Sequence, residues 1–273
     1  MSRFWRCWGD AVLGVTSAVW QATQTRNNDA MRPPVPSKNG ILAVSASLNA
    51  RLGSFTTTVA PEGVYLPIRE ITWLPAMENK GEGVFLQFSS DAVEAWASRP
   101  DVVSHGRRLE QGFDLWRQEH QGTHRKFPFL PYLMLHSFSH LLITAVSLEC
   151  GYPASSIRER IYALPGIGYG VLLDTGTADS EGTLGGLIQV GRRIHEHIRS
   201  ALELGELCSN DPVCAQHDPS HAHERRFLHG AACHGCLLIA ETSCEQHNDF
   251  LDRVLAVRTV ENRSIEFFKL PVS

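Results

Sequence analysis

Cys208-Ser209-Asn210-Asp211-Pro212-Val213-Cys214, followed by Cys233-His234-Gly235-Cys236, decides the fold of the C-terminal region of this chain. In a Cys-x2-Cys turn, both thiolates reach one tetrahedral ion about 2.3 Å away. The first pair is spaced more widely, and the Asp-Pro step between its cysteines favours a turn. The pairs flank an 18-residue loop in a region with little apolar material, so a shared ion would supply folding free energy locally. This pattern predicts one structural Zn²⁺ held by Cys208, Cys214, Cys233 and Cys236.

Other residues in the same region compete for a place in this site. Cys244 is a reserve ligand, and His217, His229 and His234 are further candidates. The alternatives to zinc are buried free cysteines, and a redox or iron–sulfur role. Five cysteines crowded into 37 residues of a hydrophilic segment favour metal binding over buried thiols. Four thiolates leave no open position for water, so the expected role of the ion is structural.

The composition is that of a globular protein. The 273 residues are 43% hydrophobic and 20% charged, which excludes a disordered chain and permits one large or two modest domains. A formal net charge of −4 provides no global basic field, so any contact with nucleic acid has to come from a local patch or a partner. Because the cysteines are uneven in spacing and no stretch has the apolarity of a membrane span, we expect a cytoplasmic protein.

We divide the chain into four parts by texture. A poorly ordered lead at 1–40 precedes a β-rich segment at 41–130, a predicted zinc-binding region at 131–260 and a tail at 261–273. The predicted fold class is α+β, a small mixed sheet with several helices and a C-terminal four-cysteine zinc-binding module. Expected strands cover 41–45, 53–60, 64–68, 84–88, 169–174 and 264–270. Expected helices cover 92–98, 132–149, 156–163, 187–207 and 249–257, with irregular structure over 99–130.

Two patterns resemble parts of catalytic sites. His136-x3-His140 places two imidazoles on one helix face, but Ser137 stands where zinc proteases have glutamate, and core histidines are the commoner reading. Glu78-Asn79-Lys80 matches part of a metal-dependent nuclease motif, which also needs an upstream acidic residue to hold Mg²⁺.

A glycine-rich stretch is a candidate for anion contact. Gly182, Gly185 and Gly186 lie between a predicted strand and a predicted helix, where free backbone N–H groups meet phosphate. Arg192 and Arg193 are nearby cations for DNA or partner contact. Close packing of strand and helix explains these glycines equally well.

Several motifs follow one another in the order of one known family. They are Trp73-Leu74-Pro75-Ala76, Lys80-Gly81-Glu82-Gly83-Val84-Phe85-Leu86, Leu135-His136-Ser137-Phe138-Ser139-His140-Leu141-Leu142-Ile143, Glu149-Cys150-Gly151-Tyr152, Ser155-Ser156-Ile157-Arg158-Glu159-Arg160-Ile161-Tyr162, Asp179-Ser180-Glu181-Gly182-Thr183-Leu184-Gly185-Gly186, both cysteine pairs, Glu241-Thr242-Ser243-Cys244-Glu245 and Leu251-Asp252-Arg253. Over residues 70–257 the chain resembles the C-terminal part of DrmB-type proteins of the DISARM anti-phage system. The same segment is similar to the MZB (MrfA-type zinc-binding) domain found behind superfamily 2 helicase cores.

The resemblance implies a non-catalytic accessory subunit that works with a superfamily 2-type helicase on phage DNA. It places the zinc role on Cys208, Cys214, Cys233 and Cys236, with Cys244 in an adjoining motif. Family members are longer, so the resemblance also implies a truncated relative. The alternatives are a Mg²⁺-dependent nuclease that uses Glu78 and Lys80, or an inactive gene remnant.

Overall fold

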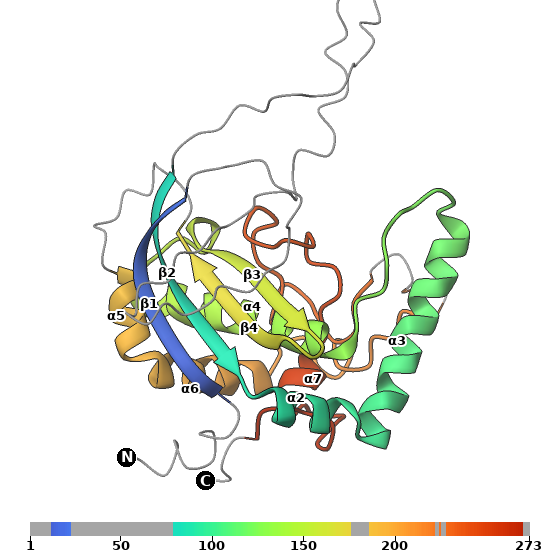
Figure 1. Cartoon of the computed structure of the whole chain (residues 1–273). Helices are drawn as coiled ribbons and strands as arrows, with labels where there is room; N and C mark the ends of the chain where they lie inside the picture. Colours follow the sequence, from blue (N-terminus) through green and yellow to red (C-terminus); the bar gives the residue numbers. More distant parts are fainter. Residues whose placement is uncertain (1–11, 23–78, 176–185, 222–223, 225–227, 270–273) are drawn as a thin grey trace, which may run out of the picture.

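The computed structural model describes residues 12–22, 79–175, 186–221, 224 and 228–269 (Figure 1). Within them, four strands form one sheet in the order β1-β2-β4-β3, and all three pairings are antiparallel, where a mixed sheet was expected. The strands are β1 (Val12–Ala22), β2 (Asn79–Phe88), β3 (Arg158–Leu164) and β4 (Gly168–Asp174). Together with the helices this sheet confirms the α+β class. The expected strands at 41–45, 53–60 and 64–68 lie outside the described residues.

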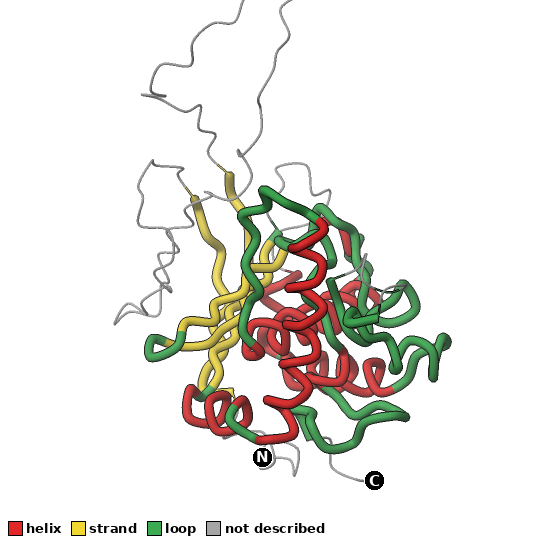
Figure 2. Tube along the Cα trace, turned by 90° about the vertical axis from the view of Figure 1, so that its right-hand side faces the viewer, coloured by secondary structure: helices red, strands yellow, loops and turns green. Residues whose placement is uncertain are grey.

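The helices lie mainly on one side of the sheet, as Figure 2 shows. In chain order they are α2 (Ser90–Ala97), α3 (Pro100–Glu119), α4 (Leu130–Cys150), the 3₁₀ turn η1 (Ala154–Ser156), α5 (Gly186–Arg192), α6 (Ile194–Glu206) and α7 (Arg253–Ala256). The predicted helices at 92–98 and 132–149 are confirmed by α2 and α4, and the predicted strand at 169–174 by β4. The predicted helix at 187–207 is present as two helices that meet at Arg193.

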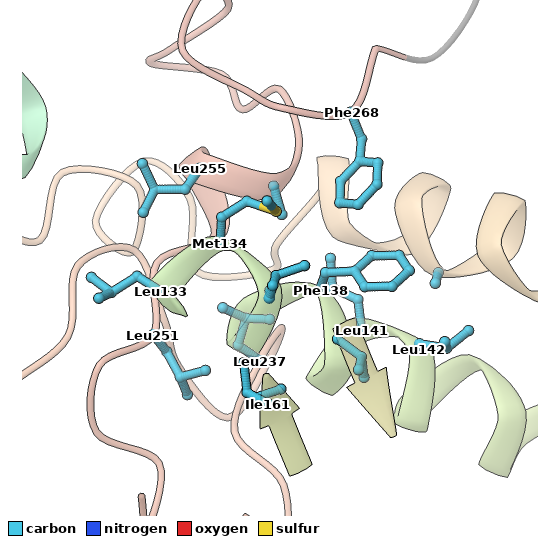
Figure 3. Packing of buried hydrophobic residues seen from close by; sticks show 14 of the residues in the cluster. Leu133, Met134, Phe138, Leu141, Leu142, Ile161, Leu237, Leu251, Leu255 and Phe268 are labelled. Atoms are coloured by element: carbon cyan, nitrogen blue, oxygen red, sulfur yellow. The ribbon is translucent and has the colours of Figure 1, made fainter. Parts of the chain in front are cut away.

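Helix α4 is the centre of the hydrophobic core. It begins with Pro131 in its first turn, ends at Gly151 in the left-handed region (φ 72°), and packs against β3, β4, α6 and α7. Figure 3 shows Leu133 and Phe138 of α4 beside side chains from the C-terminal segments. By length and mean hydropathy (1.3) α4 passes the test for a membrane span, but 72% of that window is buried inside the protein. It is therefore the core helix of the fold.

Helix α3 replaces the irregular structure expected over 99–130. Its buried residues Val102, Leu109 and Phe113 recur at spacings of seven and four, which is one face of a helix. The sequence analysis was wrong here because charged residues dominate the other face and hide this stripe. Strand β1 likewise lies inside the lead at 1–40, for which no regular structure was expected.

Strand β3 replaces the short helix that the capping-box pattern predicted at 156–163. Along β3 every second residue is buried, and the strand pairs with β4 over its full length. The Glu159 side chain, which the capping box would direct to a helix N-terminus, is buried against histidines of α4 instead. Tertiary pairing therefore overrode a local helix signal.

The C-terminal segments contain less regular structure than predicted. Only Arg253–Ala256 of the expected helix at 249–257 is helical, and Asp252 caps it by accepting a hydrogen bond from the Val254 N–H. Residues 264–269 form no strand; two of them attach to the α7 region through the N–H groups of Phe267 and Phe268. These segments pack their side chains into the core around α4 without regular backbone structure, so periodicity did not identify them.

Candidate metal centre

Four cysteine sulfurs meet at the end of α6. The Sγ atoms of Cys208 and Cys233 are 3.4 Å apart, those of Cys214 and Cys236 3.6 Å, and those of Cys233 and Cys236 3.7 Å. All four atoms lie within 4.8 Å of one another. The structure thus brings together both cysteine pairs that the spacing singled out.

Two tight turns hold the sulfurs in place. In the first turn, the Asp211 N–H donates to the Cys208 carbonyl, and the Asn210 N–H donates to the Cys208 sulfur at 3.4 Å. In the second, the N–H groups of Cys236 and Leu237 both donate to the Cys233 carbonyl at 3.0 Å. The turns approach so closely that a Cβ atom on Gly235 would lie 2.9 Å from the first turn. Glycine at this position therefore permits the contact.

The site carries a buried cation that the sequence analysis did not predict. Arg253 is fully buried, and its guanidinium donates to the Asp211 carboxylate at 2.7 Å and to the Gly205 carbonyl at 3.0 Å. Its charge also acts on the nearby sulfurs, and it contributes to lowering the pKa of Cys236. Arg253 belongs to a Leu251-Asp252-Arg253 motif of the family resemblance, but its ionic role gave no local signal, because its partners Gly205 and Asp211 lie 48 and 42 positions away in the sequence.

The pKa values of the four thiols favour binding of one cation by all four sulfurs. The hydrogen bond with Cys214 lowers the pKa of Cys236 to about 6 and raises the pKa of Cys214 far above its ordinary value. Burial raises the pKa of Cys208 to about 11. Thiols this close titrate together, because the charge of one thiolate disfavours the next. A metal ion that replaces their protons is coordinated by all four sulfurs.

The donor set fits one Zn²⁺. Four thiolates at these separations form the closed tetrahedral set typical of structural zinc, with backbone N–H groups directed at the sulfur. No position is left for a reacting water, so the chemistry that such an ion supplies is cross-linking of the two turns.

The other predicted candidates lie apart from this site. The rings of His217 and His229 contact each other in a tilted arrangement with centroids 4.7 Å apart, and His234 is exposed. The reserve ligand Cys244 is buried and lies beside His136.

The structure gathers His136, His140, Glu159 and Cys244 into a second cluster, which we call the buried cluster. The two imidazoles share a face of α4, as their spacing predicted, and all four residues are buried. Burial lowers the histidine pKa values, but the Glu159 charge and the hydrogen bonds with Cys244 and Glu159 together outweigh it and raise the pKa of both rings. In turn the two imidazoles lower the pKa of Glu159, against the opposing effect of burial. Sequence reasoning missed Glu159, whose position on the inner face of β3 was its only signal.

The anion-contact and nuclease candidates are only partly described. Gly182, Gly185 and Glu78 lie outside the described residues. Gly186 begins α5, and Arg192 and Arg193 are exposed, with Arg193 paired to Glu196. Lys80 lies in β2.

A buried core helix, an antiparallel sheet and a four-thiol site define a zinc-binding domain, and residues 138–237 match the MZB family, the MrfA Zn-binding domain. The match includes all four clustered cysteines. The chain is also 40% identical over 200 residues to the DISARM protein DrmB of Bacillus paralicheniformis (strain ATCC 9945a / NCIMB 11709 / CD-2). That alignment covers 72% of this chain, which spans only 35% of the relative. Together the two findings support a DrmB-type protein that carries an MZB domain.

Proposed function

We propose that this chain is a zinc-dependent, non-catalytic accessory component of a DISARM antiviral defence complex. The observation that carries the proposal is the 40% identity to DrmB together with an MZB match that contains the four-thiol site. In this proposal Cys208, Cys214, Cys233 and Cys236 are the zinc ligands. The ion acts as scaffold, because a closed four-thiolate site has no position for substrate.

The proposed partner is a superfamily 2-type helicase, with DNA reached through the complex. A net charge of −4 supports protein contact over autonomous DNA binding. The proposed contact surface is α5 and the turn after it. The end of this helix and that turn present the exposed Arg192 and Arg193. We also propose Gly182, Gly185 and Gly186 as contact residues on the basis of their sequence pattern, and we propose that the complex is cytoplasmic.

The proposed functional region is the zinc-binding segment 131–260, preceded by the lead at 1–40 and the β-rich segment at 41–130, and followed by the tail. The support for close cooperation between these segments is the sheet itself. Strand β2 of the preceding segment pairs with β4 of the zinc-binding segment from Gly83–Asp174 to Phe88–Tyr169. The partner surface would therefore rest on a core shared by both.

Co-purification with a superfamily 2-type helicase of a DISARM system tests the proposal. We expect the tagged full chain to retain the helicase, and the double substitution R192E/R193E to reduce retention at least about tenfold, which is the effect of roughly 1.4 kcal/mol. Arg107→Glu is the matched control, because Arg107 is equally exposed but lies on α3. Retention that is unchanged in R192E/R193E contradicts the surface, and no retention by the wild type contradicts the partner.

A plasmid assay tests the non-catalytic role. We expect no Mg²⁺-dependent nicking by the purified full chain. Nicking that Glu78→Ala abolishes would establish the nuclease alternative instead.

A further inference from the structure

The buried cluster combines four metal-ligating side chains from three segments. His136 and His140 come from α4, Glu159 from β3, and Cys244 from the loop before α7. Glu159 Oε1 lies 2.8 Å from His136 Nε2 and 3.1 Å from His140 Nε2, and Cys244 Sγ lies 3.1 Å from His136 Nε2. The ligand atoms all lie within 4.8 Å of one another.

The hydrogen bond made by Nδ1 of each imidazole determines whether its Nε2, which faces the cluster, carries a proton or a lone pair. Nδ1 of His136 lies 3.1 Å from the Phe250 carbonyl oxygen, and Nδ1 of His140 lies 2.8 Å from that of Leu237. Carbonyl oxygens only accept, so each Nδ1 carries the proton and donates it. In the neutral rings both Nε2 atoms are therefore acceptors.

This arrangement directs several acceptors at one another. Two Nε2 lone pairs and a carboxylate oxygen meet in a space sealed from water, and the thiol brings only one proton to it. Lone pairs facing each other at about 3 Å repel unless protons or a metal ion lie among them. The site is therefore built for positive charge.

The groups around the cluster are those that orient metal ligands. Imidazole ligands of zinc typically donate their second nitrogen to a backbone carbonyl, as both do here. The Cys244 sulfur accepts the N–H groups of Gln246 at 3.3 Å and Asn248 at 3.2 Å, which supports a thiolate. The second oxygen of Glu159 contacts the Ser139 hydroxyl.

We propose that His136, His140, Glu159 and Cys244 bind a second Zn²⁺, separate from the four-cysteine site. Four ligands with nitrogen, oxygen and sulfur donors are typical of tetrahedral zinc. Zn–N distances of about 2.0 Å place the ligand atoms of such a site about 3.3 Å apart. The three shortest of these separations, 2.8–3.1 Å, differ from that value by a few tenths of an ångström, and all the ligand atoms lie within 4.8 Å of one another. Because all four ligands are buried, the ion is a structural clamp that joins α4, β3 and the loop before α7.

The zinc content of the purified full chain tests this site. We expect two zinc ions per wild-type chain and one in Cys244→Ser, with a parallel loss of one in Cys236→Ser. Cys150→Ser is the control, because Cys150 is exposed and belongs to neither cluster. Two zinc ions retained in Cys244→Ser would overturn the proposal.

X-ray absorption at the zinc edge tests the site in the wild-type protein, so it does not depend on a variant that folds. Two occupied sites predict five sulfur and three nitrogen or oxygen ligands shared between two ions, with the outer-shell scattering of imidazole. One zinc per chain, or an all-sulfur shell without imidazole scattering, overturns the second site and leaves the four-cysteine site intact.

Discussion

The four-cysteine site and the buried cluster differ in how the fold assembles them. The four-cysteine site consists of two loop turns close in sequence, and three of its sulfurs are partly exposed. The buried cluster joins a helix, a strand and a loop, and its His136 and Cys244 are 108 positions apart. A local site organises a segment that has little core of its own, whereas the buried cluster depends on the core already formed around it.

The two sites are also joined physically. Cys236 is a sulfur of the four-cysteine site, and the next residue, Leu237, accepts the hydrogen bond from His140. The loop that leaves the cysteine turn continues directly to Cys244. Changes at one site therefore have a short route to the other, and the variants below are chosen to separate them.

The largest expected effect is that of Cys236→Ser. Structural zinc contributes on the order of 10 kcal/mol to the folding of small zinc domains, so we expect loss of one zinc and local unfolding of the two cysteine turns at 208–214 and 233–236. Zinc analysis and limited proteolysis measure both effects. A folded Cys236→Ser protein with unchanged zinc content would contradict the ligand assignment.

Next in size is the difference in zinc release between the two sites. We expect a strong chelator to remove zinc from the four-cysteine site at least about tenfold faster, because the buried cluster opens only when core structure opens locally. A chromogenic chelator should therefore report two phases of equal amplitude. A single phase at two ions per chain would contradict the contrast in accessibility.

The third prediction concerns the cation beside the four-cysteine site. Arg253→Met keeps most of the side-chain volume but leaves the Asp211 carboxylate and the thiolates without their buried positive charge. Removal of one partner from a buried ion pair costs about 3–5 kcal/mol. We expect that loss in urea unfolding, together with weaker zinc retention, and no change in the slow phase of zinc release. Arg107→Met, on the exposed face of α3, is the control.

What the sequence predicted follows the same division between local and assembled features. The cysteine pairs were found because their geometry is encoded within a few residues, and α4 because its apolar stripe ends at Gly151. Glu159 was assigned to a helix cap because its partners, His136 and His140, are not its neighbours in sequence. The ionic role of Arg253 gave no sequence signal for the same reason. Contacts that form only when distant segments pack together leave no pattern in the local sequence.

Two carboxylates on neighbouring strands, the buried Glu159 on β3 and the half-buried Asp174 on β4, extend the comparison. Imidazoles lower the pKa of Glu159, whereas burial raises the pKa of Asp174 to about 6 against the opposing effect of Arg158 and Arg160. The charged form of Glu159 therefore stabilises the fold above its unfolded-state pKa, and this contribution is lost as the pH falls through the folded-state pKa. The charged form of Asp174 destabilises the fold increasingly as the pH rises from about 4 to about 6.

The same chemical change, acid to amide, should therefore have opposite effects at the two positions. At pH 8 we expect Glu159→Gln to lose at least about 2 kcal/mol, the size of one charge-assisted hydrogen bond, and Asp174→Asn to gain at most about 3 kcal/mol, since one pKa unit corresponds to about 1.4 kcal/mol. Urea unfolding at pH 8 and pH 5.5 in zinc-containing buffer measures both, and the gain of Asp174→Asn should shrink at the lower pH. A loss of stability in both variants at pH 8 would mean that Asp174 also has a compensating partner, and the contrast between the two carboxylates would fail. Opposite signs would show that the cationic surroundings of the buried cluster, and not burial itself, decide where this fold tolerates a charged acid.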